Sequence, residues 1–347
     1  MRIAQVAPLC ESVPPKLYGG TERVVASLTD ELVRLGHSVT LFASGDSQSS
    51  ATLVPVCPRA LRLGGSCDML PPHLLMVEQV AKRASEFDII HFHVAHLHFS
   101  VARRLRVPHV TTLHGRLDLP ELGPLYKEFA DVRVVSISEA QRAPLADANW
   151  IGTVYHGLPA RGFTFHPNPG SYFAFLGRIS PEKRVDRAVA IADACGVPLR
   201  IAAKVDPVDA EYFKRDIEPL LDRPLVEYIG EIGEQQKSDF LGHARALLFP
   251  IDWPEPFGLV MIEALACGTP VIAFRGGSVS EILEDGVTGF IVDDMQQAIE
   301  AARHVGQIDR TACRRAFERR FTAARMAARY LRLYRNVLQP AAPELVA

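Results

Sequence analysis

Residues 172–192 read YFAFLGRISPEKRVDRAVAIA, an apolar run followed by a glycine-containing turn and an amphipathic segment. The run over 172–177 is apolar almost throughout, which is typical of a parallel strand covered on both faces. After the turn, apolar residues recur at the spacing of one helical face, at Val185, Ala188, Val189 and Ala192. A strand, a turn and a helix in this order predict a right-handed βαβ unit, and therefore an α/β fold with a parallel sheet.

Similar units extend in both directions along the chain. Short apolar, β-branched runs fall before this unit at residues 3–9, 39–44, 88–94, 109–114, 132–138 and 153–156, and after it at 199–205, 226–232, 246–251, 270–274 and 289–292. Residues 21–35 carry another helical stripe, with Thr21 as a plausible N-cap and Gly36 as a stop signal. This alternation predicts a doubly wound sheet in each half of the chain.

A stretch rich in proline, glycine and asparagine, residues 157–170, has no periodicity and separates the two halves as a linker would. The 347 residues are also many for a single core. We therefore predict two Rossmann-like domains, over residues 1–165 and 166–320, and a C-terminal segment over 321–347. Residues 309–338 are predicted to form one long, arginine-rich helix.

The composition excludes several classes of protein. A net charge of −2 with 22% charged residues does not indicate a nucleic-acid partner. The six cysteines have no paired C-x-x-C spacing, which argues against a zinc site or a disulfide framework. No stretch approaches the roughly 18 apolar residues that cross a bilayer. The N-terminal run reads as a strand and not as a signal peptide, so we expect a cytoplasmic protein.

Two segments that follow strands carry candidate chemistry. Arg178 and Lys183 lie in the turn after residues 172–177, where an arginine fork and a mobile lysine charge would neutralise a diphosphate. The alternative for this pair is a solvated basic turn. Glu255 and Glu263 are the first and last residues of EPFGLVMIE, a loop-to-helix junction after the run 246–251. Gly258 near the start of that helix leaves N–H groups free for an anion, although either glutamate alone could be a dipole-complementing residue.

A third segment, YGGTE, opens the helix predicted over 21–35. Its glycines, Gly19 and Gly20, let the backbone approach a ligand closely. The segment lacks the G-x-G-x-x-G spacing of a dinucleotide fingerprint, and a plain turn is the alternative.

Taken together, these motifs resemble the retaining glycosyltransferases of the GT-B fold, the family 4 type, also called glycosyl transferases group 1. The resemblance covers essentially the whole chain and implies two domains that face each other across a cleft, with a C-terminal helix crossing back to the first domain. It implies that Arg178 and Lys183 hold the donor diphosphate, that Glu255 contacts the donor sugar, and that Glu263 binds the ribose hydroxyls. It places the backbone of Phe257, Gly258 and Leu259 near the sugar or phosphates, and Gly19 and Gly20 over the donor. His114, which ends the run 109–114, would face the donor sugar.

The activity implied by the resemblance is transfer of a hexose from a nucleotide-diphosphate sugar to an acceptor hydroxyl, with retention and without a metal or other cofactor. UDP-glucose is the expected donor, and the YGGTE opening resembles pterin or antibiotic glucosyltransferases of this family. The acceptor class stays open among small molecules, saccharides and lipid-linked sugars. The alternatives are a nucleotide-sugar epimerase of similar architecture and a nucleotide-sugar-binding protein without catalysis.

Three further features of the sequence each allow two interpretations. The histidines His91, His93, His96 and His98 have no carboxylate or cysteine nearby in sequence, so they predict a wall of the acceptor cleft and not a metal site. The family often has a glycine-rich sequence where this chain has residues 202–206, AAKVD. Lys204 within this segment could contact a phosphate or the base, or it could be a surface lysine. The arginines of 309–338 surround the predicted helix, which favours packing with a solvated face over contact with an anionic membrane.

Overall fold

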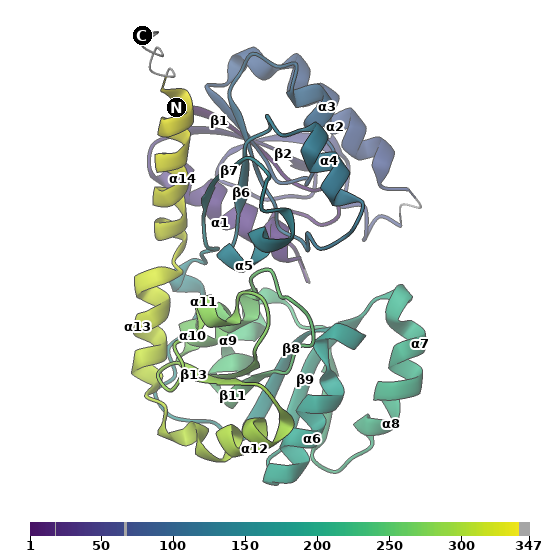
Figure 1. Ribbon diagram of the computed structural model, residues 1–347, viewed down its shortest axis with the longest axis vertical. Helices are drawn as coiled ribbons and strands as arrows, with labels where there is room; N and C mark the ends of the chain where they lie inside the picture. Colours follow the sequence, from purple (N-terminus) through teal and green to yellow (C-terminus); the bar gives the residue numbers. More distant parts are fainter. Residues whose placement is uncertain (18, 66–67, 340–347) are drawn as a thin grey trace.

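The computed structural model describes residues 1–17, 19–65 and 68–339, which form two α/β domains, one above the other in Figure 1. The first domain contains a parallel sheet in the order β3-β2-β1-β4-β5-β6-β7. Its strands are β1 (Arg2–Val6), β2 (Ser38–Ser44), β3 (Thr52–Cys57), β4 (Ile89–Phe92), β5 (His109–Thr112), β6 (Val134–Ser136) and β7 (Trp150–Thr153).

The second domain repeats this plan with a sheet in the order β10-β9-β8-β11-β12-β13. Its strands are β8 (Tyr172–Ile179), β9 (Leu199–Val205), β10 (Val226–Gly230), β11 (Ala244–Phe249), β12 (Val271–Phe274) and β13 (Gly289–Val292). The strand order reverses direction beside β1 and beside β8, and a crevice at the carboxyl ends of strands at such points is where open α/β sheets bind ligands. The prediction of two doubly wound parallel-sheet domains is confirmed.

Helices cover both faces of each sheet (Figure 1). In the first domain they are α1 (Gly20–Arg34), α2 (Leu70–Lys82), α3 (Phe99–Ala102), α4 (Leu122–Glu128) and α5 (Glu139–Arg142). In the second they are α6 (Val185–Cys195), α7 (Ala210–Tyr212), α8 (Glu218–Leu221), α9 (Glu234–Gly242), α10 (Leu259–Cys267), α11 (Val279–Ile282) and α12 (Met295–His304). The chain ends in α13 (Arg310–Arg320) and α14 (Ala323–Leu338).

Three local predictions need correction. The strand β3 was missed because it contains Pro55, which a strand accommodates at the edge of a sheet, where β3 lies. The last strand of the first domain, β7, begins at Trp150, earlier than the predicted residue 153. The first helix is preceded by Gly19 and not capped by Thr21, which lies inside the helix.

The prediction of one continuous helix over 309–338 is wrong, because α13 and α14 are separated at Phe321 and Thr322. Leu158 of the linker pairs with both sides of the break: its N–H donates to Phe321 O at 2.9 Å, and its carbonyl accepts from Ala323 N at 2.9 Å. Thr322 then caps α14 by accepting from Arg325 N at 3.4 Å. The break lets α13 pack on α10 of the second domain while α14 packs on α1 of the first (Figure 1).

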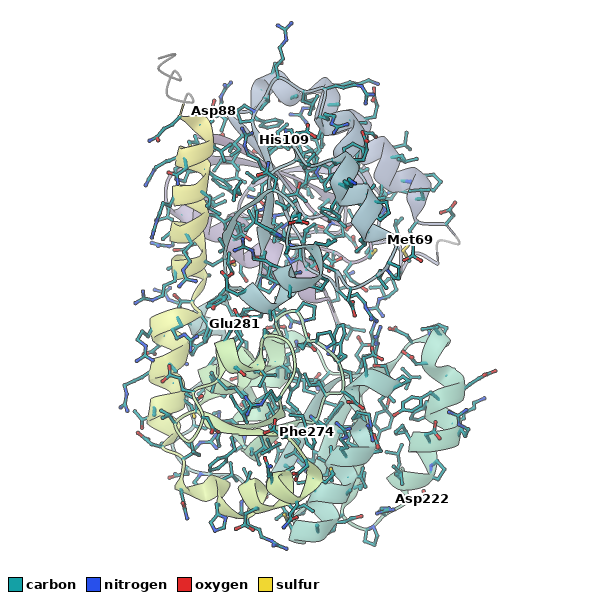
Figure 2. All side chains as sticks on the ribbon, viewed as in Figure 1. Met69, Asp88, His109, Asp222, Phe274 and Glu281 are labelled. Carbon is teal, nitrogen blue, oxygen red and sulfur yellow. The ribbon has the colours of Figure 1, made fainter. Side chains whose placement is uncertain are left out.

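Contacts between the domains hold the two sheets in one orientation. Glu281 of α11, labelled at the junction in Figure 2, accepts from the backbone N–H groups of Glu139 at 2.8 Å and Ala140 at 2.7 Å. A carboxylate is stabilised at this helix N-terminus by the free N–H groups of α5. Ser138 Oγ, just before α5, also donates to the carbonyl of Pro256 at 2.7 Å. The carboxyl ends of both sheets therefore face a shared space.

Candidate active site

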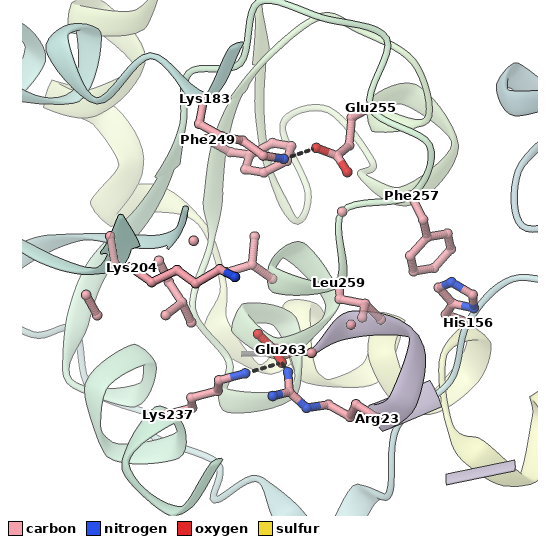
Figure 3. Close-up of a pocket in the computed structure, with 18 of the residues that line it drawn as sticks. Arg23, His156, Lys183, Lys204, Lys237, Phe249, Glu255, Phe257, Leu259 and Glu263 are labelled. Carbon is pink, nitrogen blue, oxygen red and sulfur yellow. Dashed lines mark hydrogen bonds and ion pairs between the residues drawn. The ribbon is translucent and has the colours of Figure 1, made fainter. Parts of the chain in front are cut away.

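A cavity of about 330 Å³ lies between the two domains, at the carboxyl ends of both sheets. Residues of the first domain that line it include Gly19, Gly20, Arg23, His114 and His156; those of the second include Lys183, Lys204, Lys237, Glu255, Phe257, Gly258, Leu259 and Glu263. Most of the residues predicted from the sequence are thus brought together around one space. Figure 3 shows how the charged side chains converge on it.

The first charged group in the cavity joins the turn after β8 to the loop after β11. Lys183 Nζ forms an ion pair with Glu255 Oε2, and Trp253 Nε1 donates to the same oxygen at 3.1 Å. The ammonium also lies 4.9 Å from the centroid of the Trp253 ring, close enough for a cation–π contact. Glu255 is 8% exposed, so its carboxylate is held by two donors in a largely dry site.

Arg178 takes a different position from Lys183. Its guanidinium contacts Glu182 Oε1 at 2.5 Å, Asp206 Oδ2 at 3.5 Å and Asp209 Oδ2 at 3.7 Å, and it is not among the residues that line the cavity. The two cations expected to act together on a diphosphate therefore do not converge in this conformation. Arg178 reaches a ligand in the cavity only by exchanging carboxylate partners.

The second charged group spans the domain interface around Glu263 of α10. Glu263 Oε1 accepts from Arg23 of α1 at 2.6 Å and from Lys237 of α9 at 3.2 Å. Glu234 extends the group, lying 2.7 Å from Arg23 and 3.4 Å from Lys237. Burial by itself would raise the pKa of Glu263, but the charges of Lys237 and Arg23 lower it below its usual value. The carboxylate that the resemblance assigns to the ribose is ionised and already occupied by two cations.

The start of α10 offers backbone donors to the same space. Gly258 precedes this helix with a φ of +76°, a left-handed conformation that glycine adopts at little cost. Phe257 is buried, and Leu259 lies against the glycine loop, since a Cβ built on Gly20 would be 3.4 Å from Leu259 Cδ1. The first turn of this helix lines the cavity, and its N–H groups, which have no partner within a helix, are suited to bind an anion there.

Histidines form the opposite end of the cavity. The rings of His114 and His156 are stacked with centroids 5.2 Å apart, and His156 lies 4.7 Å from the Phe257 ring (Figure 3). Burial lowers the pKa of His114 to about 3 and holds the pKa of His156 well below its ordinary value. Both imidazoles are neutral at physiological pH, which suits them to hydrogen bonding with hydroxyl groups and not to binding phosphate.

Most of the histidines predicted to line an acceptor cleft lie inside the first domain. His91, His93 and His98 are buried, His96 is exposed, and none of the four lines this cavity. The alternation along β4 is real, but it places His91 and His93 in a hydrogen-bonded layer beneath the cavity.

Among the described residues, one group has the composition and spacing of a metal site: His166, Asp239 and His243, whose ligand atoms lie within 4.8 Å of one another. It is not part of the cavity lining. Arg310 donates to the carbonyl oxygens of His166 at 2.7 Å and Gly242 at 2.8 Å, which places a permanent cation beside this group. Burial lowers the pKa of His166, with smaller contributions from the neighbouring His243 and from Arg310. The charge of Arg310 also opposes the binding of a metal cation at this position.

Sequence reasoning missed Arg23, Lys237 and His156. Arg23 directly follows the YGGTE segment and is buried, but in the sequence it lies on the polar side of the helical stripe, where nothing distinguishes it from a surface arginine. Lys237 lies on a polar helix and His156 beside the linker, and neither has a local pattern that distinguishes it from a surface residue.

Comparison with known proteins connects this geometry to a family. Residues 161–310 match the model of glycosyl transferases group 1, and residues 18–160 match that of glycosyltransferase family 4. The chain is 27% identical to the alpha-maltose-1-phosphate synthase of Mycobacterium tuberculosis, over 83% of this chain and 84% of the relative. It is 26% identical to the D-inositol 3-phosphate glycosyltransferase of Mycolicibacterium vanbaalenii, over 79% and 74%.

Solved structures agree with the fold. AviGT4, a glycosyltransferase involved in avilamycin A biosynthesis, superimposes with a TM-score of 0.76 at 26% identity and 98% coverage of both chains. HepE of Anabaena, solved with UDP and glucose, superimposes with a TM-score of 0.74 at 20% identity, over 97% of this chain and 100% of that one. With both halves matched by adjacent models and the cavity at their junction, the chain belongs to the GT-B glycosyltransferases of family 4, the glycosyl transferases group 1.

Proposed function

We propose that this glycosyltransferase moves a hexose, glucose from UDP-glucose, onto an acceptor hydroxyl with retention at the anomeric carbon and without a metal ion. The observation that carries the proposal is the pairing of Lys183 with Glu255 in a cavity that also contains Glu263 and the start of α10. A cation, a carboxylate and free helix N–H groups are the chemistry needed to bind a nucleotide diphosphate and a sugar together.

The cations of the cavity support the absence of a metal. Lys183 and Lys204 line it from the turn after β8 and from β9, and Arg178 lies near the end of β8, outside the lining. When the bond between the anomeric carbon and the diphosphate breaks, negative charge grows on the departing phosphate oxygen. Lysine and arginine side chains placed there stabilise that charge as a divalent ion would.

Retention is proposed through attack on the face from which the diphosphate leaves. The acceptor oxygen forms a bond to the anomeric carbon, the bond from that carbon to the phosphate oxygen breaks, and the acceptor proton passes to the departing phosphate. Glu255, held by Lys183 and Trp253, would hydrogen-bond to the sugar during this step and stabilise its oxocarbenium character. Closure of the two domains would exclude water, which competes as an acceptor.

The acceptor is a saccharide, a lipid-linked sugar or a small molecule with a free hydroxyl, bound on the side of the first domain.

No described helix has both the length and the apolar character required to cross a membrane.

The test begins with thermal unfolding in the presence of UDP-, GDP- and ADP-sugars, with and without EDTA. A donor at 100 times its dissociation constant adds about 2.7 kcal/mol of stability. Stabilisation by UDP-glucose that EDTA leaves unchanged supports the proposal, whereas stabilisation only by another nucleotide sugar, or only with a divalent ion, contradicts the donor or the metal independence.

Turnover then distinguishes transfer from the alternatives. We expect nucleotide release that requires an acceptor and is nearly abolished in Glu255→Ala, with Glu227→Ala, an exposed glutamate paired with Arg200, as the matched control. Arg178→Ala should weaken both donor binding and turnover. Conversion of the donor sugar without an acceptor would identify an epimerase, and stoichiometric binding without turnover would identify a binding protein.

A further inference from the structure

A chain of buried hydrogen bonds runs from the C-terminal helix to the cavity. Gln5 of β1 donates through Nε2 to the hydroxyl of Tyr334 in α14 at 3.2 Å, and its Oε1 lies 2.8 Å from His93 Nε2. His93 Nδ1 in turn lies 2.9 Å from His114 Nε2. All four side chains come from elements that are far apart in sequence, and Gln5, His93 and Tyr334 are buried, so water does not compete for these bonds.

The direction of each bond follows from the chemistry of the donors and acceptors. The carbonyl oxygen of Gln5 only accepts, so His93 carries its proton on Nε2. His93 is neutral, because burial holds its pKa well below the ordinary value, and its Nδ1 is therefore an acceptor. His114 must then donate to it from Nε2. Since His114 is also neutral, its Nδ1 bears a lone pair and no proton.

That nitrogen belongs to a ring that lines the cavity, and no hydrogen bond of the described residues satisfies it. His114 Nδ1 is buried and has no hydrogen-bond partner among the described residues, and the same holds for Nδ1 of the neighbouring His156. A buried acceptor without a partner is costly, about 1–3 kcal/mol, unless a ligand supplies a donor. The cavity is thus built with an unmet acceptor at its histidine end.

We propose that Tyr334, Gln5 and His93 are positioning residues that fix His114 as the Nε2–H tautomer, so that Nδ1 accepts a hydrogen bond from a hydroxyl of the bound sugar. The assignment of the tautomer stands on the hydrogen bonds and on the burial that keeps both rings neutral, and its use by a sugar hydroxyl rests on the proposed function. The C-terminal helix thereby sets the polarity of a side chain that lines the cavity between the domains.

The second polar chain below the cavity supports this picture. The hydroxyl of Tyr334 also lies 2.7 Å from His91 Nδ1, and His91 Nε2 lies 2.7 Å from Thr112 Oγ1. Thr112 in turn is 2.8 Å from the hydroxyl of Tyr330. Because Tyr334 accepts from Gln5, its own proton is free to go to His91, so the whole network is satisfied in one direction.

The tautomer can be measured directly, without a donor. In protein labelled with 15N at histidine, two-bond proton–nitrogen correlation distinguishes protonated from bare ring nitrogens, and the spectrum of His114→Gln identifies the signals of His114. We expect His114 protonated at Nε2 and bare at Nδ1. The opposite tautomer, with Nδ1 protonated, would overturn the proposal in the unmodified protein, whatever happens in any variant.

Two variants and one control test the role of His93. His93→Phe removes the acceptor and should leave His114 as a mixture of tautomers, whereas His93→Gln, whose amide can accept from His114 and donate to Gln5, should preserve the Nε2–H form. His98→Phe is the control, because His98 is equally buried but bonds to Thr111 and stacks on Phe92, outside this chain. An unchanged tautomer in His93→Phe, or a changed one in His98→Phe, would remove His93 from the positioning role.

Binding of UDP and UDP-glucose provides the functional readout. His93→Phe should leave the dissociation constant of UDP unchanged and lower the additional affinity for UDP-glucose about three- to tenfold, the worth of one neutral hydrogen bond. An equal loss for both probes would show a merely structural effect and contradict the positioning role. Failure of both probes to bind the unmodified protein would contradict the proposed donor, while the tautomer measurement would still decide the relay.

Discussion

Replacing Glu263 by glutamine separates the charge of this side chain from its volume. The carboxylate is 2% exposed and joins Arg23 of the first domain to Lys237 of the second, so the substitution acts on the interface as well as on the cavity. Glutamine keeps an acceptor oxygen within reach of both cations, whereas alanine removes the acceptor altogether.

The expected magnitudes follow from these two bonds. Both bonds keep their charged donor in Glu263→Gln and lose only the charge on the acceptor, so each should lose part of the roughly 1.5–3 kcal/mol that a hydrogen bond to a charged group is worth, about 1 kcal/mol per bond or about 2 in all. Glu263→Ala leaves two buried cations with only Glu234, which is 44% exposed on its side chain. Breaking a buried ion pair from one side costs about 3–5 kcal/mol, and we expect the lower end of that range because Glu234 remains.

Urea denaturation with a reporter in each domain measures the effect. The chain has two tryptophans, Trp150 in β7 of the first domain and Trp253 beside Glu255 in the second. A Trp253→Phe background therefore leaves Trp150 to report on the first domain, and a Trp150→Phe background leaves Trp253 to report on the second. Because the bridge spans the interface, both reporters should shift to lower urea. Asp293→Asn, which breaks an exposed ion pair with Arg275, is the control and should cost less than about 1 kcal/mol.

The pH dependence supplies the result that would refute this reasoning. The folded-state pKa of Glu263 lies below its unfolded value, so its contribution is complete above an unfolded pKa of about 4.3 and is lost as pH falls through the folded value. The difference between the protein and Glu263→Gln should therefore be the same at pH 7.5 and pH 5.5. A difference that grows at pH 5.5 would refute this, because a side chain that takes up a proton in the folded state gains stability as the pH falls, which would mean that burial outweighs the two cations.

Three further predictions concern other residues around the site. Ser138→Ala removes a donor to Pro256 and the cap of α5, which accepts from Gln141 N at 3.0 Å, and should cost about 2–3 kcal/mol in urea denaturation against about 1 for the exposed cap Asp294→Ala. Gly277→Ala places a Cβ 2.2 Å from Glu255 O and should lower kcat at least tenfold, whereas Gly286→Ala, also at positive φ but with open space around it, should leave kcat unchanged. His98→Gln removes one buried neutral histidine, whose folded pKa is depressed, so the stability of the unmodified protein relative to this variant should fall by about 1.4 kcal/mol between pH 7.5 and pH 5.5 in the same urea assay.

Local patterns were sufficient for the buried strands and for the two motif segments. The apolar run over 172–177 forms β8 because a strand with a parallel neighbour on each side is buried on both faces. Glu255 and Lys183 meet because they follow neighbouring strands of one parallel sheet. The same argument fails for β3, because Pro55 argues against a strand unless that strand is known to lie at the edge of its sheet. It also fails at residue 321, where the helix ends because Leu158, far away in the sequence, takes up the backbone groups on both sides of the break.

Partners of the charged residues could not be predicted from the sequence, because ion pairs depend on the packing of whole elements. The motif that contains Arg178 and Lys183 predicts two cations side by side. It does not show that Asp206 and Asp209, on a neighbouring turn, draw Arg178 away from the cavity. Nor does the sequence around Glu263 show that Arg23 from the other domain lies within 2.6 Å of it.

The pairing of these charges bears on how a donor would bind. Each of the four cations that line the cavity has a carboxylate of the protein nearby: Arg23 and Lys237 at Glu263, Lys183 at Glu255, and Lys204 at Asp206. A diphosphate that enters would therefore exchange one anion for another around a lysine, and would not meet an uncompensated, desolvated cation. The large cost of burying lone cations is avoided in the free protein, and the carboxylates released by the exchange would include the two glutamates that the family resemblance assigns to the sugar and the ribose. The same ion pairs that hold the empty cavity in shape would thus free Glu255 and Glu263 for the donor as the phosphates take their place.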